Sequence, residues 1–217
     1  MPHMSHAPFS PSAERNKQPI LDRLRQVLAA QGTALEIASG TGQHAVWFAS
    51  ALPGWTWQPT EANPKALDGI AARVTESGLS NVMPPRLLDV MAPGWSVTDS
   101  AGSADAAHAC TAPFDAVYCA NMLHISPWST CGALMRGSAQ QLAPTGLLLI
   151  YGPFLEERVP TAPGNLAFDE SLRQQNPAWG LRLLEDVTLA AQRAGLRLRE
   201  RHAMPANNLL LVFARSA

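Results

Sequence analysis

The sequence predicts a single α/β domain with a doubly wound, mostly parallel sheet of seven strands, of which the last is antiparallel. Short apolar runs alternate with segments of helical apolar spacing, which is typical of parallel strands joined by helices. A glycine turn, Gly40-Thr41-Gly42, separates the first strand from its helix. The last two apolar runs, at 196–202 and 208–213, lie so close in sequence that they can pair only as antiparallel neighbours.

The first half of the chain follows the alternating pattern closely. We expect residues 1–11 to be flexible, and apolar residues at helical spacing predict a helix over 19–30. Strands and helices are then expected in turn at 33–38, 43–52, 55–60, 64–77 and 82–88. In a parallel sheet of this kind the ligand lies at the carboxyl ends of the strands.

The second half contains two interruptions. Residues 92–113 are small and polar without an apolar period, which predicts a mobile surface loop. Strands at 114–120 and 146–151 flank a helix, and near-continuous apolar runs of this kind suit central parallel strands. Residues 152–176 are too long for an ordinary connection and are expected to form a lid-like insertion, before a helix at 182–194.

Composition limits the function. A chain of 217 residues with 47% apolar residues suits one globular domain. The net charge is −1, which argues against a nucleic-acid partner, and the three cysteines lack metal-ligand spacing, so we expect no metal. The first 20 residues contain no continuous apolar segment and no later run reaches membrane-spanning length, which predicts a cytoplasmic protein without a membrane partner. A homodimer is compatible with the sequence.

The glycine turn and three carboxylates indicate a nucleotide-like ligand. Glycine adopts positive φ angles and exposes bare backbone to a ligand. Glu36 lies inside the first strand, four residues before Gly40, and Glu61 and Asp89 follow the second and third strands. The turn also fits the G-x-G-x-x-A pattern of dinucleotide-binding folds, and Glu61 suits the ribose hydroxyls of either cofactor.

The spacing of Glu36, Gly40 and Gly42 resembles the first motif of class I S-adenosylmethionine (SAM)-dependent methyltransferases, which have a Rossmann-like fold. The resemblance implies that the glycine loop packs against the methionine and ribose of SAM, and that Asp89 accepts a hydrogen bond from the adenine amino group. Together, Asp89 and Glu36 favour SAM over NAD. The residues expected to bind the cofactor are Arg15, Glu36, Ser39, Gly40, Thr41, Gly42, Glu61, Asp89, Asn121 and Met122.

Further blocks are similar to one branch of these enzymes, the methyltransferase-like 26 family. They comprise residues 12–17, 114–128, 151–154 and 204–209. The resemblance covers nearly the whole chain and implies SAM use, but it names no methyl acceptor.

Asn121, His124 and Tyr151 are the expected catalytic residues, because they follow the fourth and fifth strands at the cofactor edge. Asn121 is placed to bond the SAM amino group or the acceptor, and alternatively caps the turn after its strand. His124 is a general base or a hydrogen-bonded packing residue. An alcohol acceptor usually requires such a base, whereas an amine or thiolate does not.

Phe154, Asp169, Arg173 and Asn207 are expected to bind the acceptor. Phe154 bounds the pocket or packs in the core. Asn165, Asp169 and Arg173 are spaced four apart and would share one helix face, where the last two alternatively form a surface ion pair. Asn207 reaches the pocket or is a left-handed turn former.

Arg15 and Asn16 lie in a charged, proline-flanked segment with no expected fold of its own. We expect residues 10–18 to become ordered only over a filled cofactor site, where Arg15 and Asn16 hold the SAM carboxylate or the acceptor. The alternative is that they cap the following helix.

These observations predict a SAM-dependent methyltransferase acting on a small polar acceptor. A SAM- or nucleotide-binding protein without transferase activity is the alternative, because no catalytic base is unambiguous. An NAD-dependent oxidoreductase is the third interpretation.

Overall fold

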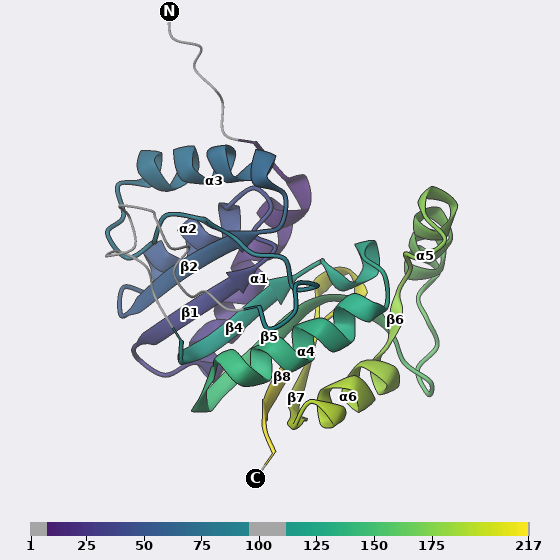
Figure 1. Ribbon diagram of the computed structural model, residues 1–217. Helices are drawn as coiled ribbons and strands as arrows, with labels where there is room; N and C mark the ends of the chain where they lie inside the picture. Colours follow the sequence, from purple (N-terminus) through teal and green to yellow (C-terminus); the bar gives the residue numbers. More distant parts are fainter. Residues whose placement is uncertain (1–7, 96–111, 217) are drawn as a thin grey trace, which may run out of the picture.

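The structure is a computed structural model that describes residues 8–95 and 112–216 (Figure 1). Most of the segment expected to be flexible, residues 1–11, and most of the expected loop at 92–113 lie outside the described residues. In the part of the chain that is described, no helix is both long and apolar enough to cross a membrane.

One sheet of eight strands forms the centre of the protein. Its strands run in the order β3-β2-β1-β4-β5-β8-β7, and the short β6 pairs with the end of β5. The strands β1 to β5 pair in parallel, and β8 is antiparallel to both β5 and β7, which confirms the predicted fold. The strands are β1 (Gly32–Ile37), β2 (Trp55–Glu61), β3 (Arg86–Leu87), β4 (Phe114–Ala120), β5 (Leu142–Leu155), β6 (Arg182–Leu183), β7 (Leu196–Met204) and β8 (Asn208–Arg215).

Helices cover both faces of this sheet (Figure 1). One face packs against α1 and α2, and the opposite face packs against α4 and α6. Figure 1 shows α5 at the side of the molecule, beside β6. The helices are α1 (Pro11–Val27), α2 (Gln43–Ala51), α3 (Pro64–Ser77), α4 (Ser129–Gln141), α5 (Pro163–Gln175) and α6 (Leu184–Arg193), with 3-10 turns η2 (Leu123–Ile125) and η3 (Pro205–Asn207).

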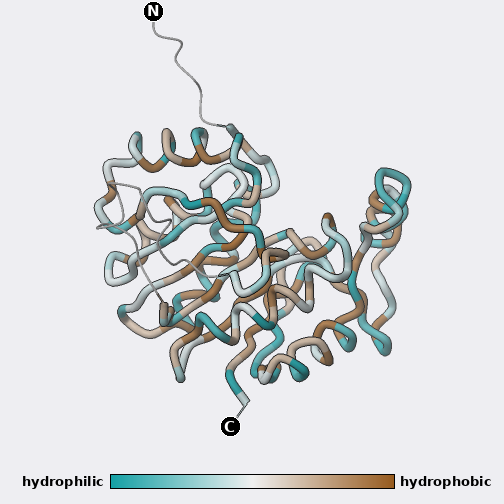
Figure 2. The backbone as a smooth tube through the Cα atoms, viewed as in Figure 1, coloured by the Kyte–Doolittle hydropathy of each residue, from teal (hydrophilic) through white to brown (hydrophobic). Residues whose placement is uncertain are grey.

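Alternation along the strands divides the core into two layers. On β4, Val117 and Cys119 point to the α4 side, whereas Ala116 and Tyr118 point to the α1 side. Successive side chains of a strand point to opposite faces, so a strand buried on both faces has to be apolar throughout. Figure 2 shows these apolar stretches in the middle of the molecule.

The expectation that residues 12–17 lack a fold of their own is wrong. They form the first turns of α1, which begins at Pro11 and continues through Pro19. Ser10 caps the helix by accepting a hydrogen bond from the Ala13 amide at 3.2 Å. Serine followed by proline is a favoured helix start, which explains why the chain is helical from Pro11 onward.

Two other boundaries differ from expectation. The third strand is Arg86–Leu87 instead of 82–88, because Pro84 and Pro85 carry no amide hydrogen for a strand ladder. The fifth strand continues to Leu155, so residues 152–155 belong to the sheet and the insertion begins after them. Most of that insertion is α5.

Candidate functional site

Two adjoining cavities lie at the carboxyl edge of the sheet. The first cavity has a volume of about 490 Å³ and lies at the ends of β1, β2 and β4. The second cavity, of about 880 Å³, lies between α1, η2, the end of β5, α5 and η3. Ser10, Asn121 and Ile125 line both cavities, so the two meet at these side chains.

The glycine turn forms one wall of the first cavity. Gly40 has φ 58°, and a Cβ added there would meet only the Ala38 carbonyl oxygen, at 4.0 Å. Its backbone therefore faces open space. Gly42 has φ 72° and does not line the cavity; a Cβ there would lie 3.0 Å from Ile70, so this glycine lets α2 begin close to α3.

Backbone amides fix two carboxylates at the cavity wall. Glu61 accepts hydrogen bonds from the amides of Gly40 (2.9 Å), Ala62 (2.9 Å) and Asn63 (3.2 Å). Asp89 accepts one from the Met91 amide at 2.8 Å through Oδ1. Both side chains line the cavity, in agreement with the placement expected from the sequence.

Glu36 is the buried carboxylate of the same cavity. Its Oε2 accepts a hydrogen bond from Trp57 Nε1 at 2.6 Å. The pKa of Glu36 is raised to about 8, because burial and, to a smaller extent, the charge of Glu61 raise it by more than the Trp57 hydrogen bond lowers it. At neutral pH this carboxyl therefore holds a proton until a cation approaches it.

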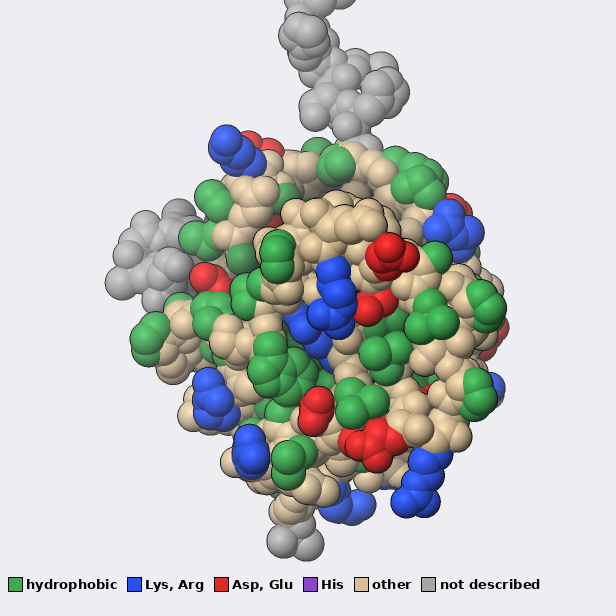
Figure 3. Space-filling view, turned by 90° about the vertical axis from the view of Figure 1, so that its right-hand side faces the viewer, with side chains coloured by type: hydrophobic (Ala, Val, Ile, Leu, Met, Phe, Trp, Pro, Cys, Tyr) green, Lys and Arg blue, Asp and Glu red, His purple; other side chains and the backbone are tan. Residues whose placement is uncertain are grey.

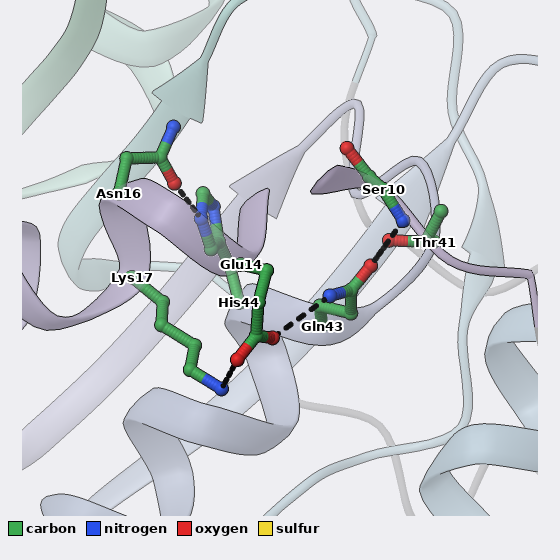
Figure 4. Close-up of polar contacts among 7 residues, drawn as sticks. All are labelled: Ser10, Glu14, Asn16, Lys17, Thr41, Gln43 and His44. Atoms are coloured by element: carbon green, nitrogen blue, oxygen red, sulfur yellow. Dashed lines mark hydrogen bonds and ion pairs between the residues drawn. The ribbon is translucent and has the colours of Figure 1, made fainter. Parts of the chain in front are cut away.

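The first turns of α1 are fixed to the glycine turn by a polar network (Figure 4). Gln43 Oε1 accepts hydrogen bonds from the Ser10 amide (2.6 Å) and the Thr41 hydroxyl (3.0 Å). His44 Nε2 lies 2.7 Å from Asn16 Oδ1, and Tyr118 approaches the other ring nitrogen at 3.2 Å. Since an amide oxygen only accepts, His44 Nε2 donates to Asn16 and the Tyr118 hydroxyl donates to Nδ1. Helix α1 thereby reaches both cavities.

Asn121 occupies the junction of the cavities in a left-handed conformation, with φ 57°. Its amide donates to the Tyr151 carbonyl oxygen at 2.9 Å, so the end of β4 stays attached to β5. Asparagine is among the few residues other than glycine that adopt this conformation at low cost. The sharp turn directs the chain into η2 and fixes the position of the side chain.

His124 lines the second cavity and is buried against Phe168, with ring centroids 5.5 Å apart. Burial, helped by the charge of Arg182, lowers its pKa to about 4. His124 is therefore neutral at physiological pH and is a weak base, poorly matched to deprotonating an alcohol. Tyr151 lines the same cavity; burial raises its pKa, whereas Asn16 and the charge of Arg15 lower it.

Arg182 holds η2 from outside the cavities. Its guanidinium donates to the carbonyl oxygens of Leu123 (3.0 Å), Ser126 (2.5 Å) and Ala178 (2.8 Å). The Gly180 amide donates to the His124 carbonyl oxygen at 3.0 Å. The segment after α5 thus positions the turn that carries His124.

Several expected site residues lie elsewhere. Phe154 is part of the hydrophobic core and lines neither cavity, because the strand continues through it. Asp169 and Arg173 form an ion pair at 2.9 Å, and Asp169 accepts the Leu181 amide at 2.6 Å, so they stabilise the turn before β6 instead of lining a cavity. Arg15 lines the second cavity and not the first.

The second cavity contains residues that were not among those expected to bind a ligand. Phe168 lines it although Asp169 and Arg173 on the same helix do not. Asn165 lines the cavity and donates through Nδ2 to the Asn207 carbonyl oxygen at 3.1 Å, which links α5 to η3. Ser10 joins both cavities, and the Ser-Pro start of α1 was the sequence signal that could have placed it there.

The model of one protein family, described as "Protein of unknown function (DUF938)", matches residues 7–215. The chain belongs to this family.

Solved methyltransferase structures share the fold. The mitomycin 7-O-methyltransferase MmcR is 17% identical with a TM-score of 0.74 over 94% of this chain and 55% of its own. An O-methyltransferase family 2 protein from Planctomyces limnophilus, in complex with apigenin, is 17% identical with a TM-score of 0.72 over 94% of this chain and 60% of its own. The SAM-dependent methyltransferase SibL is 20% identical, with a TM-score of 0.74 over 95% of this chain and 56% of its own. The chain thus spans 55–60% of the length of these proteins.

Proposed function

We propose that this member of the DUF938 family is a SAM-dependent methyltransferase that acts on a small polar acceptor. The observation that carries the proposal is the pair of cavities that meet at Asn121, one lined by carboxylates and bare glycine backbone and the other by amides and aromatic rings. A cofactor and an acceptor that react directly with each other need two such adjoining sites.

The residues of the first cavity fit SAM. Glu61 and Asp89 offer fixed acceptors for ribose hydroxyls and an amino group, and the bare backbone at Gly40 leaves room beside them. Glu36 offers a buried carboxyl that a positive charge would ionise. When bound, SAM would supply an activated methyl group: an acceptor lone pair would attack the methyl carbon, and the carbon–sulfur electrons would leave with the sulfur as a neutral thioether.

The residues of the second cavity are better suited to orienting an acceptor than to removing a proton from it. Asn121 lies between the sites, and the neutral His124 and the protonated Tyr151 provide hydrogen bonds to an acceptor. Methyl transfer from a sulfonium gains most from alignment and exclusion of water, so this arrangement is sufficient for an amine or thiol acceptor. Any proton that the acceptor loses passes to solvent.

The likeness to known proteins supports the same proposal. The fold is that of proteins named as methyltransferases, and one of them is described with S-adenosylhomocysteine bound. The similarity of several sequence blocks to the methyltransferase-like 26 family supports the finer assignment. Figure 3 shows acidic and basic side chains interspersed on the face that carries α5, which suits a small acceptor better than a polyanion there.

Calorimetry with SAM, S-adenosylhomocysteine and NADH tests the proposal. SAM and S-adenosylhomocysteine should bind and NADH should not, since the sheet ends in an antiparallel pair and the glycine turn faces a cavity suited to one nucleoside. NADH binding without SAM binding would indicate an oxidoreductase. SAM binding without formation of S-adenosylhomocysteine from a panel of thiols, amines and phenols would indicate a binding protein.

A further inference from the structure

The two cavities differ in charge. The first cavity is lined by Glu36, Glu61 and Asp89, and no Lys or Arg is among the residues described around it. The second is lined by Arg15, and no Asp or Glu is among the residues described around that cavity. A cationic ligand therefore suits the first cavity, whereas a neutral or anionic ligand suits the second.

Arg15 pairs with no carboxylate among the residues that the structure describes. The neighbouring Glu14 pairs with Lys17 at 2.6 Å and accepts a bond from Gln43, so it is directed away. Arg15 itself donates only to the Ser12 hydroxyl, at 3.3 Å, and within the described ranges 8–95 and 112–216 it forms no ion pair. Its guanidinium is thus available at the wall of the second cavity.

Two further hydrogen-bond donors lie beside Arg15. The Asn16 oxygen is occupied by His44, and Figure 4 shows the amide nitrogen of Asn16 on the side away from that ring. Tyr151 keeps its proton because burial raises its pKa, and it is close enough to Asn16 and Arg15 for both to oppose that shift. A guanidinium, an amide nitrogen and a phenol together match the acceptor atoms of a carboxylate.

Two large apolar side chains, Ile125 and Phe168, also line the second cavity. Phe168 is 41% exposed and Ile125 is 46% exposed, so both offer apolar surface to a ligand in this cavity. The ring of Phe168 stands edge-on to His124, which carries no charge at neutral pH. These groups suit a flat hydrocarbon surface.

We propose that the acceptor is a small aromatic carboxylic acid, an inference that rests on the proposed function. Its carboxylate binds Arg15, Asn16 and Tyr151, its ring lies against Phe168 and Ile125, and its nucleophilic atom reaches the junction at Asn121. The nucleophile forms a bond to the methyl carbon, the carbon–sulfur bond breaks with its electrons passing to sulfur, and a proton on the nucleophile leaves to solvent. Since His124 is a weak base, the nucleophile is an atom with a lone pair available near neutral pH.

Binding of simple carboxylates tests this inference without knowledge of the acceptor. The probes are benzoate, phenylacetate and 3-phenylpropanoate, each with its neutral amide, titrated into the protein with and without S-adenosylhomocysteine. At least one carboxylate should bind about tenfold more tightly than its amide, and Arg15→Gln should remove that preference while Arg15→Lys keeps part of it. Arg25→Gln, an exposed arginine on the same helix outside both cavities, is the matched control.

Two results would overturn the inference. The first is the absence of binding by all three carboxylates, or equal binding of acids and amides. The second is a loss of S-adenosylhomocysteine affinity in Arg15→Gln without a loss of affinity for 5′-methylthioadenosine, which lacks the amino-acid carboxylate. That outcome would assign Arg15 to the cofactor. If S-adenosylhomocysteine does not bind the wild-type protein at all, the proposed function fails, whatever the carboxylates do.

Discussion

The first and second cavities are built in different ways. The first is made by the ends of consecutive strands, and backbone amides fix its carboxylates, as at Glu61. The second is assembled from α1, η2, α5 and η3, which are far apart in the chain and are joined by side-chain bonds such as those of Arg182 and Asn165. The first therefore depends on the fold itself, whereas the second depends on a few long-range contacts.

The largest expected difference between the cavities is in their response to pH. The pKa of Glu36 is about 8 in the folded protein and 4.5 ordinarily, so between these values the folded state holds a proton that the unfolded state has released. Stability therefore falls as pH rises through this window. Glu36→Gln keeps an oxygen for Trp57, and its stability advantage over the wild type should grow by roughly 3 kcal/mol between pH 5 and pH 8.

Urea unfolding of both proteins at the two pH values measures this effect, and an advantage that does not change with pH would mean that Glu36 is ionised in the fold.

In the second cavity, the contribution of His124 to the pH dependence of stability has the opposite sign. The pKa of His124 is lowered from 6.5 to about 4 in the folded protein, so between these values the unfolded state binds a proton that the folded state does not. Burial of His124 therefore lowers the stability of the protein as the pH falls through 6.5.

The dependence of the second cavity on long-range contacts is tested at Arg182. Arg182→Ala removes three bonds to backbone carbonyl oxygens and should lower the free energy of unfolding by roughly 2–3 kcal/mol. Arg182→Lys keeps the charge but not the forked geometry, and should recover only part of this loss. SAM affinity should fall much less than stability, since Gly40, Glu61 and Asp89 lie on other elements. An equal loss of both would mean that the cavities are not independent.

The smallest of the three effects is expected at Asp89. Asp89→Ala should weaken SAM binding by about 2 kcal/mol, because a buried hydrogen bond to the ligand is lost. Unfolding should change little, as Asp89 is exposed and, among the described residues, its side chain bonds only the Met91 amide. Asp68→Ala, at an exposed position of α3 outside both cavities, is the control for calorimetry. Unchanged affinity in Asp89→Ala would remove this residue from the site.

The same contrast explains which features of the fold and of the two cavities could be predicted from the sequence. The succession of strands along the chain, the glycine turn and the placement of Glu36, Glu61 and Asp89 follow from local patterns, because strand ends and acidic residues are adjacent in the chain. Phe168 carried no local signal, since its role depends on where α5 lies in space. Asp169 and Arg173 share the spacing of Asn165, but a hydrogen bond from Leu181 turns them toward another loop.

The start of α1 could be predicted from the sequence only in part. Charge and proline content predicted an unstructured segment, whereas the Ser10 cap and Pro11 are helix-start residues. The helix continues through Pro19, which removes one internal amide but tolerates the helical φ angle. Composition alone was therefore a poor guide where capping chemistry decided the structure.

The left-handed backbone of Asn121 limits how this junction can vary. Glycine, asparagine and aspartate are the residues that adopt positive φ at low cost, so substitutions compatible with the turn carry short side chains or none. A long side chain can therefore neither bridge nor separate the two cavities at this position. Substitutions in α5 and η3, by contrast, can reshape the second cavity without disturbing the turn at which the two cavities meet.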